Sequence, residues 1–101
     1  MKRLIVIFLI FVINSCHHEP DQSARQINWD RDICATCLMG LADQKYSVQS
    51  INLREEVMWF DDLGCLVAIM ATPDWEQFDG KHARIWIGDS ETGEWIDAEK
   101  A

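Results

Sequence analysis

The chain has 101 residues, of which 9 are basic and 17 are acidic, and its formal net charge is −8. This length favours one small domain and excludes the large barrel and dinucleotide-binding enzyme folds, which need much longer chains. A hydrophobic content of 49% argues against a disordered chain. The acidic balance argues against nucleic acid as a partner, because clusters of Lys and Arg bind a phosphate backbone and the sequence contains none.

The first 16 residues are typical of an export signal that ends at a lipidation site. A short basic start precedes an unbroken run of ten apolar residues over positions 4–13. A stable transmembrane helix needs about 20 such residues, so the run fits the apolar part of a secretory signal instead. It ends at Ser15-Cys16, which resembles a bacterial lipoprotein cleavage site. We therefore predict a signal peptide over residues 1–15 and lipid attachment at Cys16. The alternative is an ordinary secretory signal that leaves Cys16 as a free thiol.

The stretch that follows the predicted lipidation site is interpreted as a tether. Residues 16–28 are mostly polar, include Pro20 and show no apolar period, so we expect the lipidated cysteine followed by a flexible segment. The folded domain is predicted over residues 29–101.

Two strands are predicted at the start of this domain. Residues 46–53 alternate imperfectly between apolar and polar side chains, which is typical of a β-strand. Residues 57–60 predict a second strand, with Val57 and Trp59 on one face and the other two residues on the opposite face. Only the short polar segment 54–56 separates them, so we expect a hairpin.

A helix of about two to three turns is predicted after the hairpin. Asp61 and Asp62 are typical N-cap residues, because a short carboxylate accepts the free N–H groups of a first helical turn. Pro73 is expected to end the helix. The predicted buried stripe consists of apolar residues spaced three and four apart, namely Leu63, Leu66, Val67 and Met70.

The remaining elements complete an α+β domain. Residues 83–89 predict a third strand with Ile85 and Ile87 facing inward, and residues 94–97 predict a short fourth strand. The order strand, strand, helix, strand indicates a small ββαβ unit with an additional C-terminal β-hairpin arm. Burial in a domain of this size supplies on the order of 3–5 kcal/mol, so a metal ion or a disulfide would add substantial stability.

The cysteines offer the clearest chemistry. With Cys16 assigned to lipid, three remain, and an odd number in an exported protein indicates a reactive or metal-binding thiol. Cys34, Cys37 and Met39 place two thiols and one thioether within six residues. Soft sulfur ligands that include a thioether favour Cu(I), whereas Zn(II) rarely accepts methionine. The pattern favours a metal site, and a structural disulfide, a redox pair or half of a zinc site are its alternatives.

Cys65 is predicted in the first turn of the helix, where three roles are open. It is a small buried apolar residue, a third sulfur ligand, or the disulfide partner of Cys34. Together with His82 and the other two cysteines it would complete a Cys₃His zinc set. An enzyme is not expected, because the sequence has no Ser/His/Asp pattern, Gly-rich phosphate loop or HExxH motif.

Several segments, taken together, resemble the NosL family, the accessory lipoproteins of nitrous oxide reductase. They extend from about residue 30 to the end of the chain, and the proposed lipidation at Cys16 agrees with them. The segments are Cys34-x-x-Cys37-x-Met39, Asp43, Tyr46-Ser47-Val48-Gln49, the run from Phe60 to Val67, the run from Ala83 to Asp89, and the run from Thr92 to Ala98.

The resemblance implies a membrane-tethered periplasmic chaperone that binds Cu(I) and supports copper-centre assembly in nitrous oxide reductase, together with a membrane ABC transporter. It also implies a ββαβ unit related to the TRASH-like metal-binding fold. By position, Cys37 and Met39 match the family's Cys-x-Met copper motif, and Cys34 matches the preceding cysteine of many members. Cys65 falls in the family's helix-start motif.

Members of the family usually continue into a second half, whereas this sequence ends at Ala101, so we expect a short variant, a fragment, or a second unit that comes from another copy. The alternative to copper delivery is a structural zinc or disulfide-stapled module that acts only through protein interactions.

Overall fold

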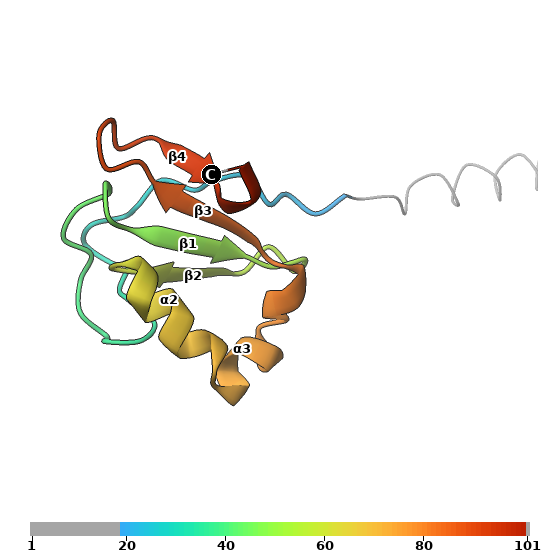
Figure 1. The fold of residues 1–101 in the computed structure, drawn as a ribbon. Coiled ribbons are helices and arrows are strands. Elements are labelled where there is room, and N and C mark those ends of the chain that lie inside the picture. The colour runs from blue at the N-terminus through green and yellow to red at the C-terminus, as the bar shows by residue number, and fades with distance from the viewer. Residues whose placement is uncertain (1–18, 101) are drawn as a thin grey trace, which may run out of the picture.

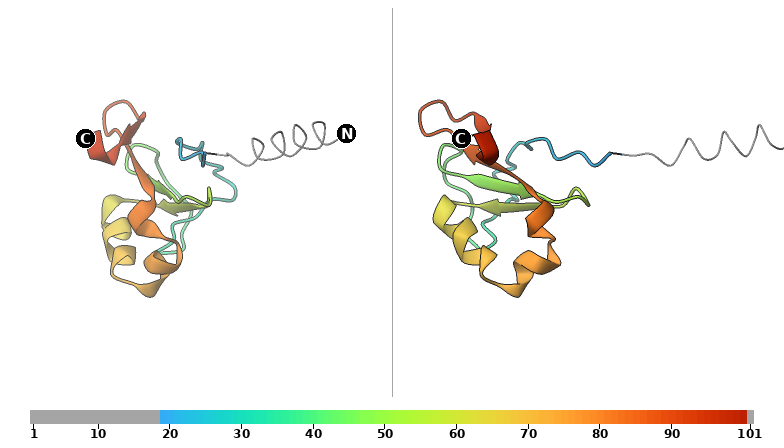
Figure 2. Two further views of the ribbon diagram at one scale, coloured as in Figure 1. Left: turned by 90° about the vertical axis from the view of Figure 1, so that its right-hand side faces the viewer. Right: turned by 45° about the vertical axis from the view of Figure 1, so that its right-hand side comes forward.

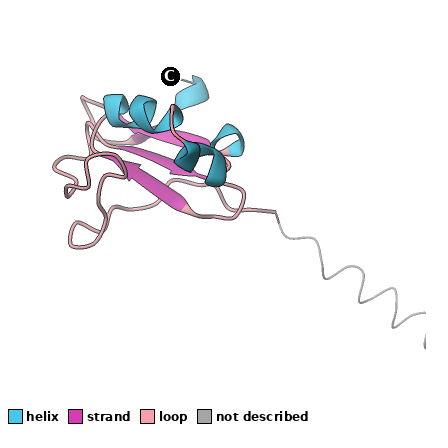
Figure 3. Cartoon of the chain, turned by 90° about the horizontal axis from the view of Figure 1, so that it is seen from below, coloured by secondary structure: helices cyan, strands magenta, loops and turns pink. Residues whose placement is uncertain are grey.

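The computed structural model describes residues 19–100, so the predicted signal peptide and Cys16 lie outside the described residues. Four antiparallel strands form one sheet in the order β2-β1-β3-β4. Two helices, α2 and α3, lie over one face of this sheet (Figures 1 and 3). The elements are β1 (Val48–Ile51), β2 (Val57–Phe60), α2 (Leu63–Met70), α3 (Pro73–Gln77), β3 (Arg84–Gly88) and β4 (Trp95–Asp97), with short 3₁₀ turns η2 (Gly80–His82) and η3 (Ala98–Lys100). The predicted α+β class is confirmed.

The strand register gives the sheet two different faces. Val48 lies opposite Phe60 on β2 and opposite Ile87 on β3, so these three side chains share one face. The next row along the strands contains Trp59, Gln49 and Trp86, which point to the opposite face. The expected hairpin between residues 46–53 and 57–60, and the expected alternation of faces within residues 57–60, are confirmed.

Helix α2 begins where the sequence predicted, but it packs along a different stripe. The Asp62 carboxylate accepts a hydrogen bond from the Cys65 N–H at 2.8 Å, as an N-cap does. The buried residues of the helix are Leu66 and Ile69. The predicted stripe was wrong at three positions, because Leu63, Val67 and Met70 are exposed. Apolar residues occur on more than one face of the helix, and only the face that carries Leu66 and Ile69 packs against the sheet.

Helix α3 was not predicted. Pro73 was expected only to end the preceding helix, but α2 already ends at Met70 and Pro73 occupies the first turn of α3. Proline suits this place, because its fixed φ is close to the helical value and its missing N–H would have no partner there.

The segment 21–27 lies against the sheet face that the helices leave open, as the side-on view shows (Figure 2). The fully buried Gln49 amide accepts from the Arg25 N–H at 2.8 Å and donates to the Arg25 carbonyl at 2.9 Å. The Trp86 indole N–H donates to the Gln22 carbonyl at 2.9 Å, and Ile27 is buried. The flexible tether predicted over residues 16–28 is therefore wrong for residues 21–27, which pack against the sheet. No helix within residues 19–100 is long and apolar enough to cross a membrane.

Candidate metal site

Three cysteine sulfurs meet at one end of the domain. The Sγ atoms of Cys34, Cys37 and Cys65 all lie within 4.8 Å of one another. Sulfurs bound to one ion at about 2.3 Å lie about 4 Å apart, so a small contraction would place all three at bonding distance. Cys34, Cys37 and Cys65 could therefore hold a metal ion, which confirms that the cysteine spacing marks a potential metal site.

The loop that carries two of these cysteines is a tight turn fixed to the sheet. The Cys34 N–H donates to the Met39 carbonyl at 2.8 Å, and the Leu38 N–H donates to the Cys34 carbonyl at 2.9 Å. Leu38 sits at the tip with a φ of 63°, in the left-handed region that disfavours side chains. The Ala35 N–H donates to the Trp59 carbonyl at 2.7 Å, which attaches the start of the loop to the outer edge of β2.

The third cysteine comes from a different element and reaches the loop through local chain geometry. Only four residues separate β2 from Cys65, which lies in the first turn of α2. The Thr36 hydroxyl donates to the Cys65 carbonyl at 2.6 Å and so joins the loop to the helix. Sequence reasoning left the role of Cys65 open, and the structure brings it together with the CxxC pair.

The three thiols differ in burial, and the surroundings of Cys34 and Cys65 shift their pKa values in opposite directions. Cys34 is fully buried, Cys65 is half-buried and Cys37 is exposed. Burial acts to raise the pKa of the Cys34 thiol, but hydrogen bonds from the backbone N–H groups of Cys37, Asp61 and Thr36 outweigh it and hold that pKa below 9.0. Burial, followed by hydrogen bonds with Cys34 and Asp62, raises the pKa of Cys65 to about 12. Of these two, Cys34 is thus the favoured thiolate, and Cys65 keeps its proton until a cation displaces it.

Met39, the predicted thioether ligand, lies in the same turn and is 67% exposed. Its backbone is held beside Cys34 by the hydrogen bond from the Cys34 N–H. The side chain is therefore not sealed in the core, and the role of its sulfur as a ligand stays a prediction.

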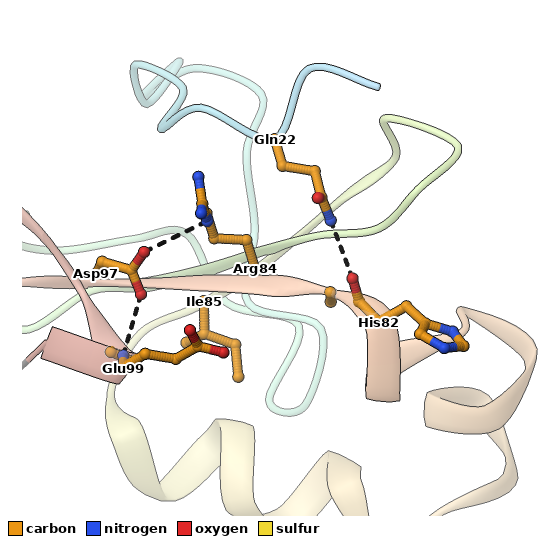
Figure 4. Close-up of a pocket in the computed structure, with 8 residues that line it drawn as sticks. Gln22, His82, Arg84, Ile85, Asp97 and Glu99 are labelled. Atoms are coloured by element: carbon orange, nitrogen blue, oxygen red, sulfur yellow. Dashed lines mark hydrogen bonds and ion pairs between the residues drawn. The ribbon is translucent and has the colours of Figure 1, made fainter. Parts of the chain in front are cut away.

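His82, the fourth ligand in the zinc alternative, is not part of this cysteine group. Its Nδ1 lies 2.9 Å from Asp79 Oδ1. His82 instead lines a separate pocket of about 220 Å³ with Gln22, Arg84, Asp97 and Glu99 (Figure 4). The buried Asp97 carboxylate in that pocket is satisfied by Arg84 Nε at 3.3 Å and by the Glu99 N–H at 3.0 Å.

Two contributors to the cysteine site were missed from the sequence. Thr36 carries the hydroxyl that joins loop and helix, and Asp61 supplies a backbone N–H to the Cys34 sulfur. The only available signal was their position, since Thr36 occupies a variable place in the CxxC motif and Asp61 was interpreted as part of an N-cap. Comparison of the chain with protein-family models, with curated proteins and with solved structures gave no match.

Proposed function

We propose that this protein is a carrier of Cu(I). The observation that supports the proposal is the gradient of exposure across the three clustered sulfurs. The buried Cys34 thiolate would anchor the ion, and the exposed Cys37 would remain accessible to the ligands of a receiving protein. Transfer of a metal between proteins requires that new ligands enter before the old ones leave, so an open position suits a carrier better than a closed cage.

The donor atoms favour copper over zinc. Cu(I) is a soft ion that is satisfied by two or three sulfur ligands, whereas structural zinc sites almost always have four ligands. Within residues 19–100, the ligand atoms that all lie close to one another at this place are the three cysteine sulfurs, and the Asp62 carboxylate, which hydrogen-bonds Cys65, is outside that group. A further sulfur from the exposed Met39 would strengthen Cu(I) binding and would add little for Zn(II).

The wider role rests on the sequence resemblance to the NosL family. In this proposal the chain is a lipoprotein of the periplasmic membrane surface that supplies copper to nitrous oxide reductase or to its ABC-type maturation transporter. The order β1, β2, α2, β3 is compatible with a TRASH-like ββαβ unit, with α3 as an addition before β3.

The position of the N-terminal segment supports presentation of the site away from a membrane. The Asp21 N–H donates to the Glu55 carboxylate at 2.8 Å, in the turn between β1 and β2. The cysteines lie at the other end of β2, where Cys34 forms a bridge with Trp59. A lipid on Cys16 would hold the first end near the bilayer and leave the sulfurs facing outward.

The test is an anaerobic titration of the full chain, reduced and held in detergent, with Cu(I) against a competing chelator. Cys37→Ser should weaken Cu(I) binding by at least tenfold, since each ligand is worth more than a hydrogen bond. Met39→Leu should weaken Cu(I) binding and leave Zn(II) binding unchanged. Met70→Leu is the control, because it removes another exposed methionine outside the turn. Equal affinity of all three variants and the parent would contradict the copper site.

A structural zinc or disulfide module is the second candidate. It is favoured by the full burial of Cys34 and by the short distances between the three cysteine sulfurs. Metal analysis and a free-thiol count on freshly exported protein distinguish the candidates. Bound zinc whose removal unfolds the domain, or an oxidised Cys34–Cys37 pair with no copper affinity after reduction, would support this second function.

A further inference from the structure

We infer that Thr36 is a positioning residue of the candidate metal site, and that its hydroxyl holds the Cys34–Cys37 loop against Cys65. This inference rests on the proposed metal-binding function. It assigns a role to a residue that touches no metal ion itself but contacts two of the three ligand residues.

The first contact is a hydrogen bond between two elements that are distant in sequence. The Thr36 hydroxyl donates to the Cys65 carbonyl at 2.6 Å across a separation of 29 residues. The backbone of the loop is fixed to β2, through the Ala35 N–H and the Trp59 carbonyl, and the Cys34 side chain also hydrogen-bonds Cys65. The Thr36 hydroxyl bond is therefore a connection to the helix that uses no ligand sulfur, and it holds the loop cysteines beside the helix cysteine.

The second contact is made by the backbone of the same residue. The Thr36 N–H is one of the backbone groups that hydrogen-bond the Cys34 sulfur. One residue thus reaches the buried sulfur through its amide and the helix through its side chain. Movement of Thr36 would displace Cys34 and Cys37 relative to Cys65, and the three sulfurs would no longer meet at one point.

Loss of the Thr36 hydroxyl should reduce the number of sulfur ligands rather than abolish metal binding. Without the hydroxyl, the CxxC pair still offers two sulfurs, and Cys65 becomes separated from them. Because one hydrogen bond of this kind contributes a modest net free energy, its loss should weaken three-sulfur binding by about five- to tenfold.

The experiment uses Thr36→Val, which replaces the hydroxyl with a methyl group at nearly equal volume, and Thr36→Ser, which keeps the hydroxyl. The matched control is Thr72→Val, because the Thr72 hydroxyl also donates to a backbone carbonyl of α2, that of Ile69 at 2.7 Å, at the far end of the helix. The probe is Co(II), added anaerobically to the full chain in detergent, since its charge-transfer absorption grows with the number of bound thiolates. Zn(II) competition then gives the affinity.

Thr36→Val should lose about a third of the thiolate-to-cobalt intensity and bind about five- to tenfold more weakly, whereas Thr36→Ser and Thr72→Val should match the parent. A parent-like Thr36→Val, or a Thr36→Ser variant as weak as Thr36→Val, would overturn the inference. The serine variant separates the hydroxyl bond from a general packing effect.

A metal-free measurement keeps the inference separate from the proposed function. A short thiol-bridging reagent should join Cys37 to Cys65 in the parent, with the product mapped by peptide mass spectrometry, and should do so at least fivefold more slowly in Thr36→Val. If the parent binds no metal but bridging still depends on the hydroxyl, the proposed function fails and the positioning role stands. If bridging rates are equal, the positioning role fails whatever the metal affinity.

Discussion

Cys34 and Cys65 carry identical side chains but differ in acidity, because their surroundings differ. The backbone N–H groups around Cys34 favour its thiolate, while burial and the neighbouring Cys34 and Asp62 favour the protonated form of Cys65. Within one cluster, Cys34 thus favours the thiolate and Cys65 favours the protonated thiol. Metal binding must release that proton, so affinity at the site should increase with pH.

The raised pKa of Cys65 also predicts a pH dependence of stability. A thiol whose pKa is higher in the folded chain than in the unfolded chain stabilises the fold while it is protonated. That contribution is complete below the unfolded value of about 9 and is lost as pH rises toward about 12. Urea unfolding of the reduced, chelator-treated chain should therefore show a free energy of unfolding that falls over this range, and Cys65→Ala should flatten part of the fall. Parallel pH curves for parent and variant would contradict the assignment.

At the scale of the element, α2 has apolar residues on several faces and buries only one of these faces. Leu66 and Ile69 pack into the core with Val48 and Phe60. Leu63, Val67 and Met70 remain exposed although they are equally apolar. The orientation is consistent with the N-cap at Asp62 and with the link from Thr36 to Cys65, which fix the first turn of the helix.

Two alanine substitutions one residue apart test this orientation. Leu66→Ala should lower the free energy of unfolding by about 2–5 kcal/mol, because it removes buried methyl groups and leaves a cavity. Val67→Ala should change it by less than about 0.5 kcal/mol, because Val67 is 59% exposed. Chemical denaturation of both variants measures the difference. A loss at Val67 as large as that at Leu66 would show that the predicted stripe, and not the observed one, faces the sheet.

At the scale of the whole molecule, the sheet is covered on both faces by segments of very different character. The helices cover one face with apolar side chains, whereas residues 21–27 cover the other mainly through hydrogen bonds to Gln49 and Trp86. The second layer contains a single buried apolar residue, Ile27. Residues 21–27 therefore stabilise the fold mainly by hydrogen-bonding the Gln49 amide and the Trp86 indole N–H.

Removal of this segment should therefore destabilise the domain. A chain that begins at Trp29 loses the burial of Ile27, worth about 1.5–3 kcal/mol, and leaves the Gln49 amide without its partners, at about 1–3 kcal/mol. Compared with a chain that begins at Glu19, it should unfold at lower urea by an amount equivalent to about 3 kcal/mol. Equal urea midpoints for the two chains would show that residues 19–28 add no stability, and the folded domain would then begin at Trp29.

The sequence by itself determined the features that depend on near neighbours. Residues 46–53 specified one strand, residues 57–60 specified a second strand and its faces, and Asp62 marked the start of the helix. The spacing of Cys34, Cys37 and Met39 indicated a potential metal site, because two cysteines three positions apart can turn both sulfurs toward one point.

The tertiary structure decided what depends on residues distant in sequence. It placed Cys65 beside Cys34 and Cys37, selected Leu66 and Ile69 as the buried side of α2, and brought the segment 21–27 onto the sheet. A local pattern shows which side chains are apolar, but it does not show which of several apolar sides meets a partner. It also does not reveal that a polar segment will hydrogen-bond a buried amide. From the sequence, Gln49 and Arg25 are both expected to be solvent-exposed, and only the folded sheet brings the Gln49 side chain to the Arg25 backbone.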